Sequence, residues 1–198
     1  EKLAHYANAA ADIEFKFPFG FKELEGIHSR TDFDLSAHEK FSGRKLQYFD
    51  PERNENYVPY VVETSIGLDR MFLALFSNCL KDEVLEDGSE RTVLSLPPAL
   101  APVKAAILPL VKKDGLAEKA QDIYHSLKRS FNVTYDDGGA IGKRYTRQDL
   151  AGTPFCIAVD YQTMEDNTVT IRDRDTMEQE RIALDQVEAW LAPRLLGC

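Results

Sequence analysis

The sequence YVPYVVETSIGLDRMFLALFSNCL, residues 57 to 80, joins an apolar strand directly to a helix. In its first part Val58, Tyr60 and Val62 alternate with other residues, a period of two that is typical of a strand with one buried face. In its second part apolar residues recur at steps of three and four, which predicts a helix with one apolar face. These residues are Leu68, Met71, Phe72, Leu75 and Cys79. Such a junction presents free backbone N–H groups that can meet an anionic ligand, so it is the first candidate binding site.

Polar side chains crowd this junction, and Arg70 is the unusual one among them. A cation in the first turn of a helix opposes the helix dipole, an effect of about 0.3–1 kcal/mol at an exposed site. A bound polyphosphate would compensate, because a guanidinium offers a fork of donors that stays charged at any working pH. The alternative is that Arg70 pairs with Glu63 or Asp69. Glu63 and Ser65 also have an ordinary interpretation, as a strand-end carboxylate and a helix N-cap.

A second polar segment, GFKELEGIHSRTDFDL, covers residues 20 to 35. It follows a half-buried strand predicted at residues 12–21 and begins as a second extended piece, in which Glu23 and Glu25 fall on the same side. Gly26 permits a close approach of another group to the backbone. The two carboxylates could act as general acid and base or bind a cation, whereas the alternative is a solvated strand face.

The first half of the chain reads as strand, strand, helix, hairpin and helix. The first helix follows residue 32, with a predicted capping box from Ser36 to Glu39 and a stop at Gly43. Neighbouring antiparallel strands without βαβ alternation favour an α+β fold, in which helices pack on an antiparallel sheet. The sequence has no glycine-rich GxxxxGK loop, so a nucleotide site must be built from other elements.

A domain boundary is predicted within residues 81–98, KDEVLEDGSERTVLSLPP, a charged segment that ends in two prolines. We therefore expect one domain at residues 1–96 and another at residues 97–198. In the second domain strands and helices alternate before a closing hairpin and a last helix, which predicts an α/β fold with a mixed sheet between helices. Asp114 is the expected cap of its first helix, and Asp185 with Glu188 forms a predicted capping box for its last.

A basic cluster in the second domain is the best candidate for contact with a nucleic acid: Lys143, Arg144, Tyr145 and Arg147. Single-stranded RNA loops are held by phosphate contacts and by bases that stack on aromatic or guanidinium planes, and this segment offers both kinds of group. The alternative is a solvated helix face, which is the more common role of charges on a short helix.

The composition limits the function classes further. An apolar content of 43% with 29% charged residues is typical of a soluble globular protein, and the net charge of −9 argues against a protein that coats nucleic acid indiscriminately. The longest apolar stretches, near residues 94–111, are interrupted by prolines and are too short for a bilayer, and no secretory leader opens the chain. Cys79, Cys156 and Cys198 are far apart, which predicts reduced thiols in a cytosolic protein and no disulfide framework or metal site.

The motif ETSIGLDR at residues 63–70 resembles the third signature motif of class II aminoacyl-tRNA synthetases, and with GFKELEGIHSRTDFDL it resembles the glycyl-tRNA synthetases. The resemblance covers essentially the whole chain. It implies part of an antiparallel class II catalytic core followed by an anticodon-binding domain with a mixed sheet. The first two class II motifs have no counterpart, so the chain resembles the C-terminal portion of a longer enzyme. The alternatives are a non-catalytic nucleic-acid-binding relative and a threonyl or prolyl specificity.

The resemblance also implies roles for particular residues. Those that would bind glycine are Glu63, Thr64, Ser65, Ile66 and Gly67. Those that would bind ATP are Glu23, Leu24, Gly67, Leu68, Asp69 and Arg70. Lys143, Arg144, Tyr145 and Arg147 would contact tRNA(Gly). ATP would arrive with Mg²⁺ as a substrate complex, with no metal site in the protein and no tightly bound prosthetic group. A cytoplasmic homodimer is implied for the full-length protein. Thr64 departs from the proline that is common in the family.

Overall fold

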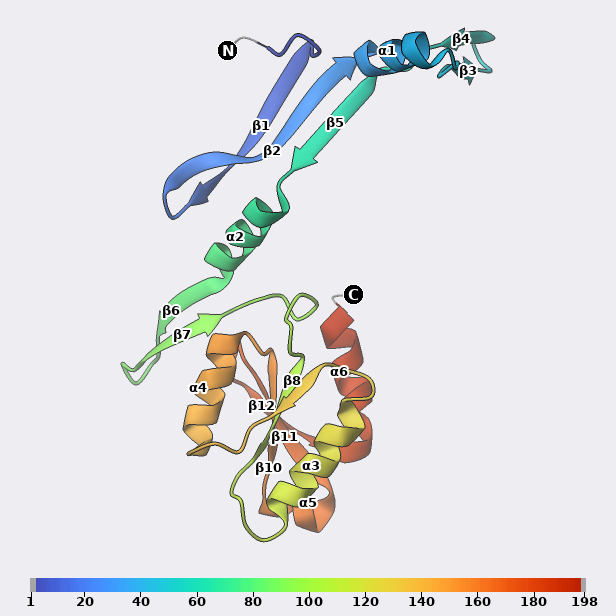
Figure 1. The fold of residues 1–198 in the computed structure, drawn as a ribbon. Helices are drawn as coiled ribbons and strands as arrows, with labels where there is room; N and C mark the ends of the chain where they lie inside the picture. Colours follow the sequence, from blue (N-terminus) through green and yellow to red (C-terminus); the bar gives the residue numbers. More distant parts are fainter. Residues whose placement is uncertain (1–2, 197–198) are drawn as a thin grey trace. The chain divides into compact units, whose positions relative to one another are not determined.

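The structure is a computed structural model that describes residues 3–196 (Figure 1). The chain divides into two compact units, Glu1–Ser77 and Asn78–Cys198. Among the described residues no helix is both long and apolar enough to cross a membrane.

The first unit is built on a three-stranded antiparallel sheet in the order β1-β2-β5, which confirms the predicted antiparallel arrangement. Its strands are β1 (Ala9–Phe17), β2 (Gly20–Thr31) and β5 (Val61–Ile66). Gly20 has a φ of +105° in the turn between β1 and β2, a conformation that favours glycine. The sheet then leads into the helix α2 (Leu68–Cys79).

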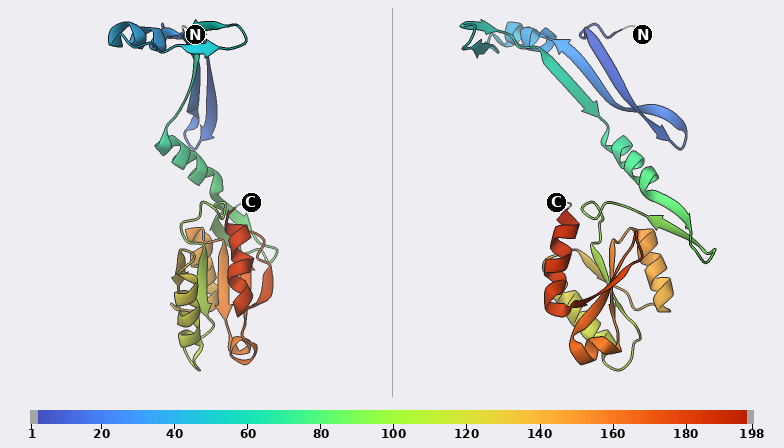
Figure 2. Two further views of the ribbon diagram at one scale, coloured as in Figure 1. Left: turned by 90° about the vertical axis from the view of Figure 1, so that its right-hand side faces the viewer. Right: turned by 180° about the vertical axis from the view of Figure 1, so that it is seen from behind.

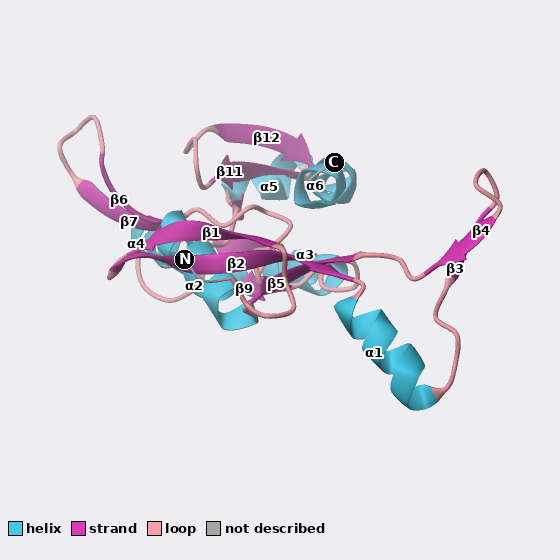
Figure 3. Cartoon of the chain, turned by 90° about the horizontal axis from the view of Figure 1, so that it is seen from above, coloured by secondary structure: helices cyan, strands magenta, loops and turns pink. Residues whose placement is uncertain are grey.

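Helix α1 (Phe33–Ser42) and a small hairpin of β3 (Tyr48–Asp50) and β4 (Glu55–Tyr57) connect β2 to β5 (Figure 3). Gly43 ends α1 in the left-handed conformation, as predicted. The predicted capping box is wrong, because the N-cap is Asp32 and the Ser36 hydroxyl donates to its carboxylate at 3.0 Å. Helix α1 therefore starts one turn earlier than the box implied.

The second unit has a mixed five-stranded sheet in the order β12-β11-β10-β8-β9, as the alternation of strands and helices predicted. The parallel strands are β8 (Ala105–Pro109), β9 (Val133–Tyr135) and β10 (Phe155–Val159). The antiparallel strands β11 (Thr168–Asp173) and β12 (Gln179–Ala183) complete it. Helices α3 (Leu116–Leu127) and α6 (Val187–Leu196) pack on one face and α4 (Ile141–Ala151) on the other (Figure 2).

Several helix starts in this unit differ from the predicted ones. Helix α3 begins after Gly115, which has a φ of +78°, and the Asp114 carboxylate instead accepts a hydrogen bond from the Tyr161 hydroxyl at 2.9 Å. A 3₁₀ turn (Leu184–Gln186) precedes α6, so Asp185 lies within that turn, and Glu188 accepts a hydrogen bond from Ser130. The short helix α5 (Tyr161–Asp166) was not predicted, although Asp160 and Thr163 form a capping box at its start.

The hairpin of β6 (Leu80–Val84) and β7 (Glu90–Leu94) belongs to the second unit, so the unit boundary precedes the predicted one. Val93 is fully buried, and a side chain on Gly152 would lie 3.1 Å from the Leu94 carbonyl oxygen, so hairpin and α4 are in close contact. Pro97 and Pro98 follow the hairpin within the second unit.

Buried charges hold this hairpin to the unit. The Asp149 carboxylate, 5% exposed, accepts hydrogen bonds from Arg172 at 2.8 and 3.1 Å and from Arg91 at 3.4 Å. Arg174 is 1% exposed and donates to the carbonyl oxygens of Gly152 and Leu96. Each buried guanidinium thus has the acceptors that burial of a charge requires.

Cys79 and Cys156 are buried, unpaired thiols, as predicted, and burial raises the pKa of Cys156 to about 12. Cys198 lies outside the described residues.

Candidate ligand junction and nucleic-acid interface

The pairing of β5 with β2 decides which junction side chains share a face. Glu63 lies opposite His28, and Ser65 lies opposite Gly26. Directly opposite residues of an antiparallel pair point to the same side, and side chains two apart along a strand do as well. Glu63, Ser65 and His28 therefore share one face of the sheet.

The remaining residues predicted to bind glycine are placed differently. Thr64 and Ile66 alternate with Glu63 and Ser65 along β5, so they lie on the other face. Gly67 lies between β5 and the first turn of α2, where its carbonyl oxygen accepts a hydrogen bond from the Met71 amide. The structure thus gathers only part of the predicted set on one surface.

Arg30 fixes the Glu63 carboxylate, a role that the sequence did not reveal. Arg30 Nη1 donates to Glu63 Oε2 at 2.6 Å, while Nε and Nη2 donate to both carboxylate oxygens of Asp34 at 2.5 and 3.0 Å. The guanidinium also lies 4.0 Å from the centroid of the Tyr6 ring. Its hydrogen bonds lower the pKa of Asp34. The spacing of Arg30 and Asp34 was a usable signal for their pairing, but nothing local indicated Glu63.

Arg70 and Glu23, both predicted to bind ATP, come together from distant parts of the chain. Arg70 lies exposed in the first turn of α2, and its Nη1 donates to the backbone carbonyl oxygen of Glu23. Within residues 3–196 it forms no ion pair with Glu63 or Asp69, so the alternative pairing weighed for Arg70 is wrong. Leu24 is half-buried, and Leu68 and Asp69 are exposed beside Arg70.

The basic cluster of the second unit does not form one surface. Lys143 is exposed on α4, but Arg144 is 3% exposed and donates to the carbonyl oxygens of Pro109 and Gly139. The prediction that Arg144 contacts RNA therefore needs correction, because backbone acceptors inside the unit already occupy its guanidinium. It fixes the end of β8 to the loop before α4.

Tyr145 and Arg147 also have partners within the unit. The Tyr145 ring packs against Ala106, Leu108 and Cys156, with the Arg172 guanidinium 5.0 Å from its centroid, and burial raises the pKa of its hydroxyl to about 12. Arg147 donates to both carboxylate oxygens of Asp136, at 2.7 to 3.0 Å, yet its side chain remains 48% exposed. Only Lys143 and Arg147 of the four therefore present a charge to solvent.

The loop at the carboxyl end of β9 contacts Arg147, which donates to the Asp136 carboxylate and to the carbonyl oxygen of Gly138. Lys112 and Lys113 follow β8 and are exposed, and Lys112 pairs with Asp137 at 3.0 Å. Burial alone would raise the pKa of Asp136, but the Gly138 amide and Arg147 lower it overall. In open α/β sheets ligands bind at the carboxyl ends of parallel strands, so this edge is the candidate interface.

The environment of Asp160 leads us to expect that the stability of the second unit depends on pH. Its carboxylate accepts hydrogen bonds from Arg181 at 2.6 and 2.9 Å, which together with Thr163 lower its pKa. A carboxyl group whose pKa is lower in the folded state stabilises the fold above its unfolded pKa, near 4, and loses that effect as the pH falls through the folded value. Asp160→Asn is expected to lower the free energy of unfolding by about 1 kcal/mol at pH 7.

Urea titrations at pH 7, 4 and 2.5 check this prediction. The variant should lose less stability than the wild type between pH 7 and 2.5. Equal losses in the two proteins would contradict the assignment.

Comparison with known proteins identifies relatives of both units. Residues 104–194 match the family of the anticodon binding domain. The glycine–tRNA ligase of Chlorobaculum tepidum is 56% identical over 196 residues, covering 99% of this chain and 42% of that protein. The glycine–tRNA ligase of Geobacillus kaustophilus is 53% identical over 195 residues, 98% of this chain and again 42% of the relative. The chain thus spans less than half the length of the curated relatives it matches.

A solved structure shares the fold. The crystal structure titled as the RNA binding domain of threonyl-tRNA synthetase from Cryptosporidium parvum Iowa II aligns with a TM-score of 0.70 at 22% identity. The alignment covers 96% of this chain and 44% of the other.

Proposed function

We propose that this chain, which is similar to glycine–tRNA ligases over nearly its whole length, is the C-terminal portion of an enzyme that activates glycine with ATP and transfers it to tRNA(Gly). The observation that carries the proposal is the arrangement of two pairs of residues at the junction of β5 with α2. Glu63 and Ser65 share a face of the β2–β5 pair, and Arg70 contacts the Glu23 backbone where β5 enters α2. The first unit is then the part of the catalytic core that contains this junction.

The reaction needs positioning and charge neutralisation more than covalent chemistry. The glycine carboxylate attacks the α-phosphate of ATP, pyrophosphate leaves, and a ribose hydroxyl of the tRNA terminus then displaces AMP from the mixed anhydride. Arg70 would bind the phosphates at the start of α2, with Glu23 and Leu24 bordering the nucleotide. Mg²⁺ would arrive as part of the ATP complex and share the neutralisation of the phosphates.

Selection of glycine requires exclusion, because glycine has no side chain to recognise. Glu63 and Ser65 would take the α-ammonium group, and the Arg30 contact would keep the Glu63 carboxylate in one orientation. A larger amino acid would bring a methyl group against these polar atoms and remove them from water without offering a hydrogen bond.

The second unit would bind the anticodon arm at the carboxyl ends of β8 and β9. Lys112, Lys113, Lys143 and Arg147 would contact phosphates there, since each retains exposed surface. Arg144 would act indirectly, by holding the loop that leads into α4. In the full-length protein we further propose a homodimer located in the cytoplasm.

Lys143→Ala tests the anticodon interface. Loss of one phosphate contact is expected to weaken binding of tRNA(Gly) about 3- to 10-fold near 0.1 M salt and to lower the slope of log K against log salt by about one. Binding measured across a salt series would show both effects. Arg129→Ala, an exposed cation after α3, is the matched control and should leave affinity and slope unchanged. Equal effects of the two variants would contradict an interface at α4.

Glycine-dependent ATP–pyrophosphate exchange by the full-length protein tests the activity. Alanine, serine, threonine and proline should be assayed beside glycine, and we expect exchange with glycine alone. Exchange with threonine or proline would assign a different specificity. No exchange with any amino acid, while tRNA still bound, would indicate a non-catalytic relative.

A further inference from the structure

Arg30 contacts two carboxylates with different parts of its guanidinium. Nε and Nη2, which form one edge of the fork, donate to both oxygens of Asp34 at 2.5 and 3.0 Å, whereas Nη1 donates to a single oxygen of Glu63 at 2.6 Å. Arginine forks frequently pair edge-on with one carboxylate, and here that carboxylate is Asp34. The contact with Asp34 therefore decides how much of Glu63 the guanidinium covers.

The backbone around Arg30 is irregular. The register of β2 against β5 shifts between Ser29 and Thr31, which leaves Arg30 without a residue paired opposite it. Thr31 has a φ of +55°, which is uncommon for a β-branched residue. Such irregularities redirect a side chain from the position that regular pairing would give it. The strand thus departs from regular geometry at the residue that contacts Glu63.

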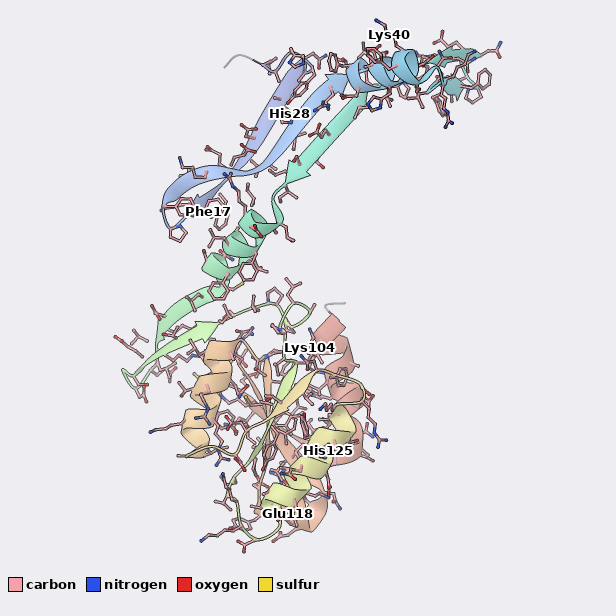
Figure 4. The ribbon with its side chains drawn as sticks, viewed as in Figure 1. Phe17, His28, Lys40, Lys104, Glu118 and His125 are labelled. Carbon is pink, nitrogen blue, oxygen red and sulfur yellow. The ribbon has the colours of Figure 1, made fainter. Side chains whose placement is uncertain are left out.

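Helix α1 supplies the second carboxylate directly after this irregularity. Asp34 lies in the first turn of α1, where the helix dipole also favours a negative charge. In Figure 4 the label of Lys40 marks α1 and that of His28 marks β2, and the helix follows directly on the end of the strand. The Tyr6 ring packs against the guanidinium, with its centroid 4.0 Å from the guanidinium carbon. The start of α1 and this ring therefore both help to fix the guanidinium.

The single contact leaves the Glu63 carboxylate open to a ligand. The Glu63 side chain is 36% exposed, and Arg30 donates to Oε2 alone. An edge-on pair would instead place donors on both oxygens and bring the positive charge closer to each of them. A cationic group such as the α-ammonium of an amino acid would bind less well to a carboxylate that is paired in this way.

We propose that Asp34 is a positioning residue for glycine, because it holds the two-donor edge of Arg30 and so leaves Oε1 of Glu63 for the α-ammonium group. The inference rests on the proposed function, since it concerns the residue proposed to bind that group. Asp34 would not touch glycine and would act through Arg30. Without the Asp34 charge, the guanidinium would turn its edge towards Glu63 and compete with the ligand.

Asp34→Asn tests the inference in the full-length enzyme with little change of shape. We expect KM for glycine in pyrophosphate exchange to rise at least about 5-fold, because the guanidinium must release one Glu63 oxygen before the ligand binds. KM for ATP should change less than about 2-fold. Asp50→Asn is the matched control, since this carboxylate lies near another arginine, Arg53, at 3.7 Å, and it should leave both constants unchanged.

A double-mutant cycle separates action through Arg30 from a direct electrostatic effect of Asp34. Arg30→Gln removes the guanidinium that Asp34 is proposed to hold. In that background Asp34→Asn should change KM for glycine less than about 2-fold, because the two substitutions then act on one contact. A further 5-fold rise in the double variant would overturn the inference, as would an unchanged KM for glycine in Asp34→Asn alone.

A crystal structure of the full-length Asp34→Asn variant gives a readout that is independent of activity. The guanidinium of Arg30 should contact both oxygens of Glu63, and retention of the single contact would overturn the inference while the proposed function stood. Absence of exchange in the wild type with every amino acid would overturn the proposed function and this inference with it.

Discussion

Arg70→Ala is expected to lower glycine-dependent pyrophosphate exchange by the full-length enzyme at least about 100-fold. The guanidinium lies exposed in the first turn of α2, within reach of the Glu23 backbone, where we propose that the triphosphate binds. Charge develops on the phosphates as the α-phosphate is attacked, and loss of one preorganised donor to such charge typically lowers the rate by two to three orders of magnitude. Exchange assays at saturating and at limiting ATP would measure the loss in kcat and in KM.

Arg53→Ala provides a matched control for this prediction. Arg53 is an exposed arginine in the loop between β3 and β4, where its contacts are loose ion pairs with Asp50 and Glu55 at 3.7 Å. Its removal should change exchange less than about 2-fold. Retention of more than a tenth of the wild-type rate in Arg70→Ala would remove Arg70 from the phosphate site.

Asp149→Asn is expected to lower the free energy of unfolding of the second unit by about 3–5 kcal/mol. The carboxylate lies between Arg172 and Arg91, which are 9% and 8% exposed, and it is the acceptor for both. Removal of one partner from a buried ion pair leaves an uncompensated buried charge, and here Arg172 would lose its charged partner, whereas Arg91 keeps its ion pair with Glu83 at 2.7 Å. Urea denaturation followed by circular dichroism would measure the change.

Asp185→Asn is the corresponding control, since this carboxylate is exposed in the 3₁₀ turn before α6. A change of less than about 0.5 kcal/mol is expected for it. A similarly small change in Asp149→Asn would show that the buried network contributes little to stability. It would also mean that Arg172 finds other hydrogen-bond acceptors in the variant.

Local patterns predicted the architecture of both units well. A period of two identified β1 and β2, and the switch from alternation to helical spacing located the junction of β5 with α2. These signals are strong because each depends on residues that are neighbours along the chain. The predicted buried face of the strand before α2 was wrong, because β5 begins only at Val61 and the side chains of Tyr60 and Val62 are 69% and 68% exposed. The antiparallel sheet followed from short connections, and the mixed sheet followed from alternating strands and helices.

The environment of the charged side chains could not be predicted in the same way. Arg144, Gln148 and Asp149 form the polar, buried face of α4, although charges on a short helix usually face solvent. Arg144 and Asp149 find partners on β8, β7 and β11, which are distant in sequence, whereas Gln148 accepts a hydrogen bond from the nearby Thr153. The contact of Arg30 with Glu63 was hidden for the same reason, since β2 and β5 are separated by a helix and a hairpin.

The β6–β7 hairpin changes what should be regarded as a transferable module. A fragment that begins at residue 97, or at the start of the family match at residue 104, would lack Arg91 and the fully buried Val93. It would also lose the carbonyl oxygen of Leu96, an acceptor for the buried Arg174. A fragment made for gene fusion or domain exchange, or obtained by limited proteolysis, should therefore begin near Asn78 to keep the unit intact. In a chimaera, the linker should be placed before the hairpin.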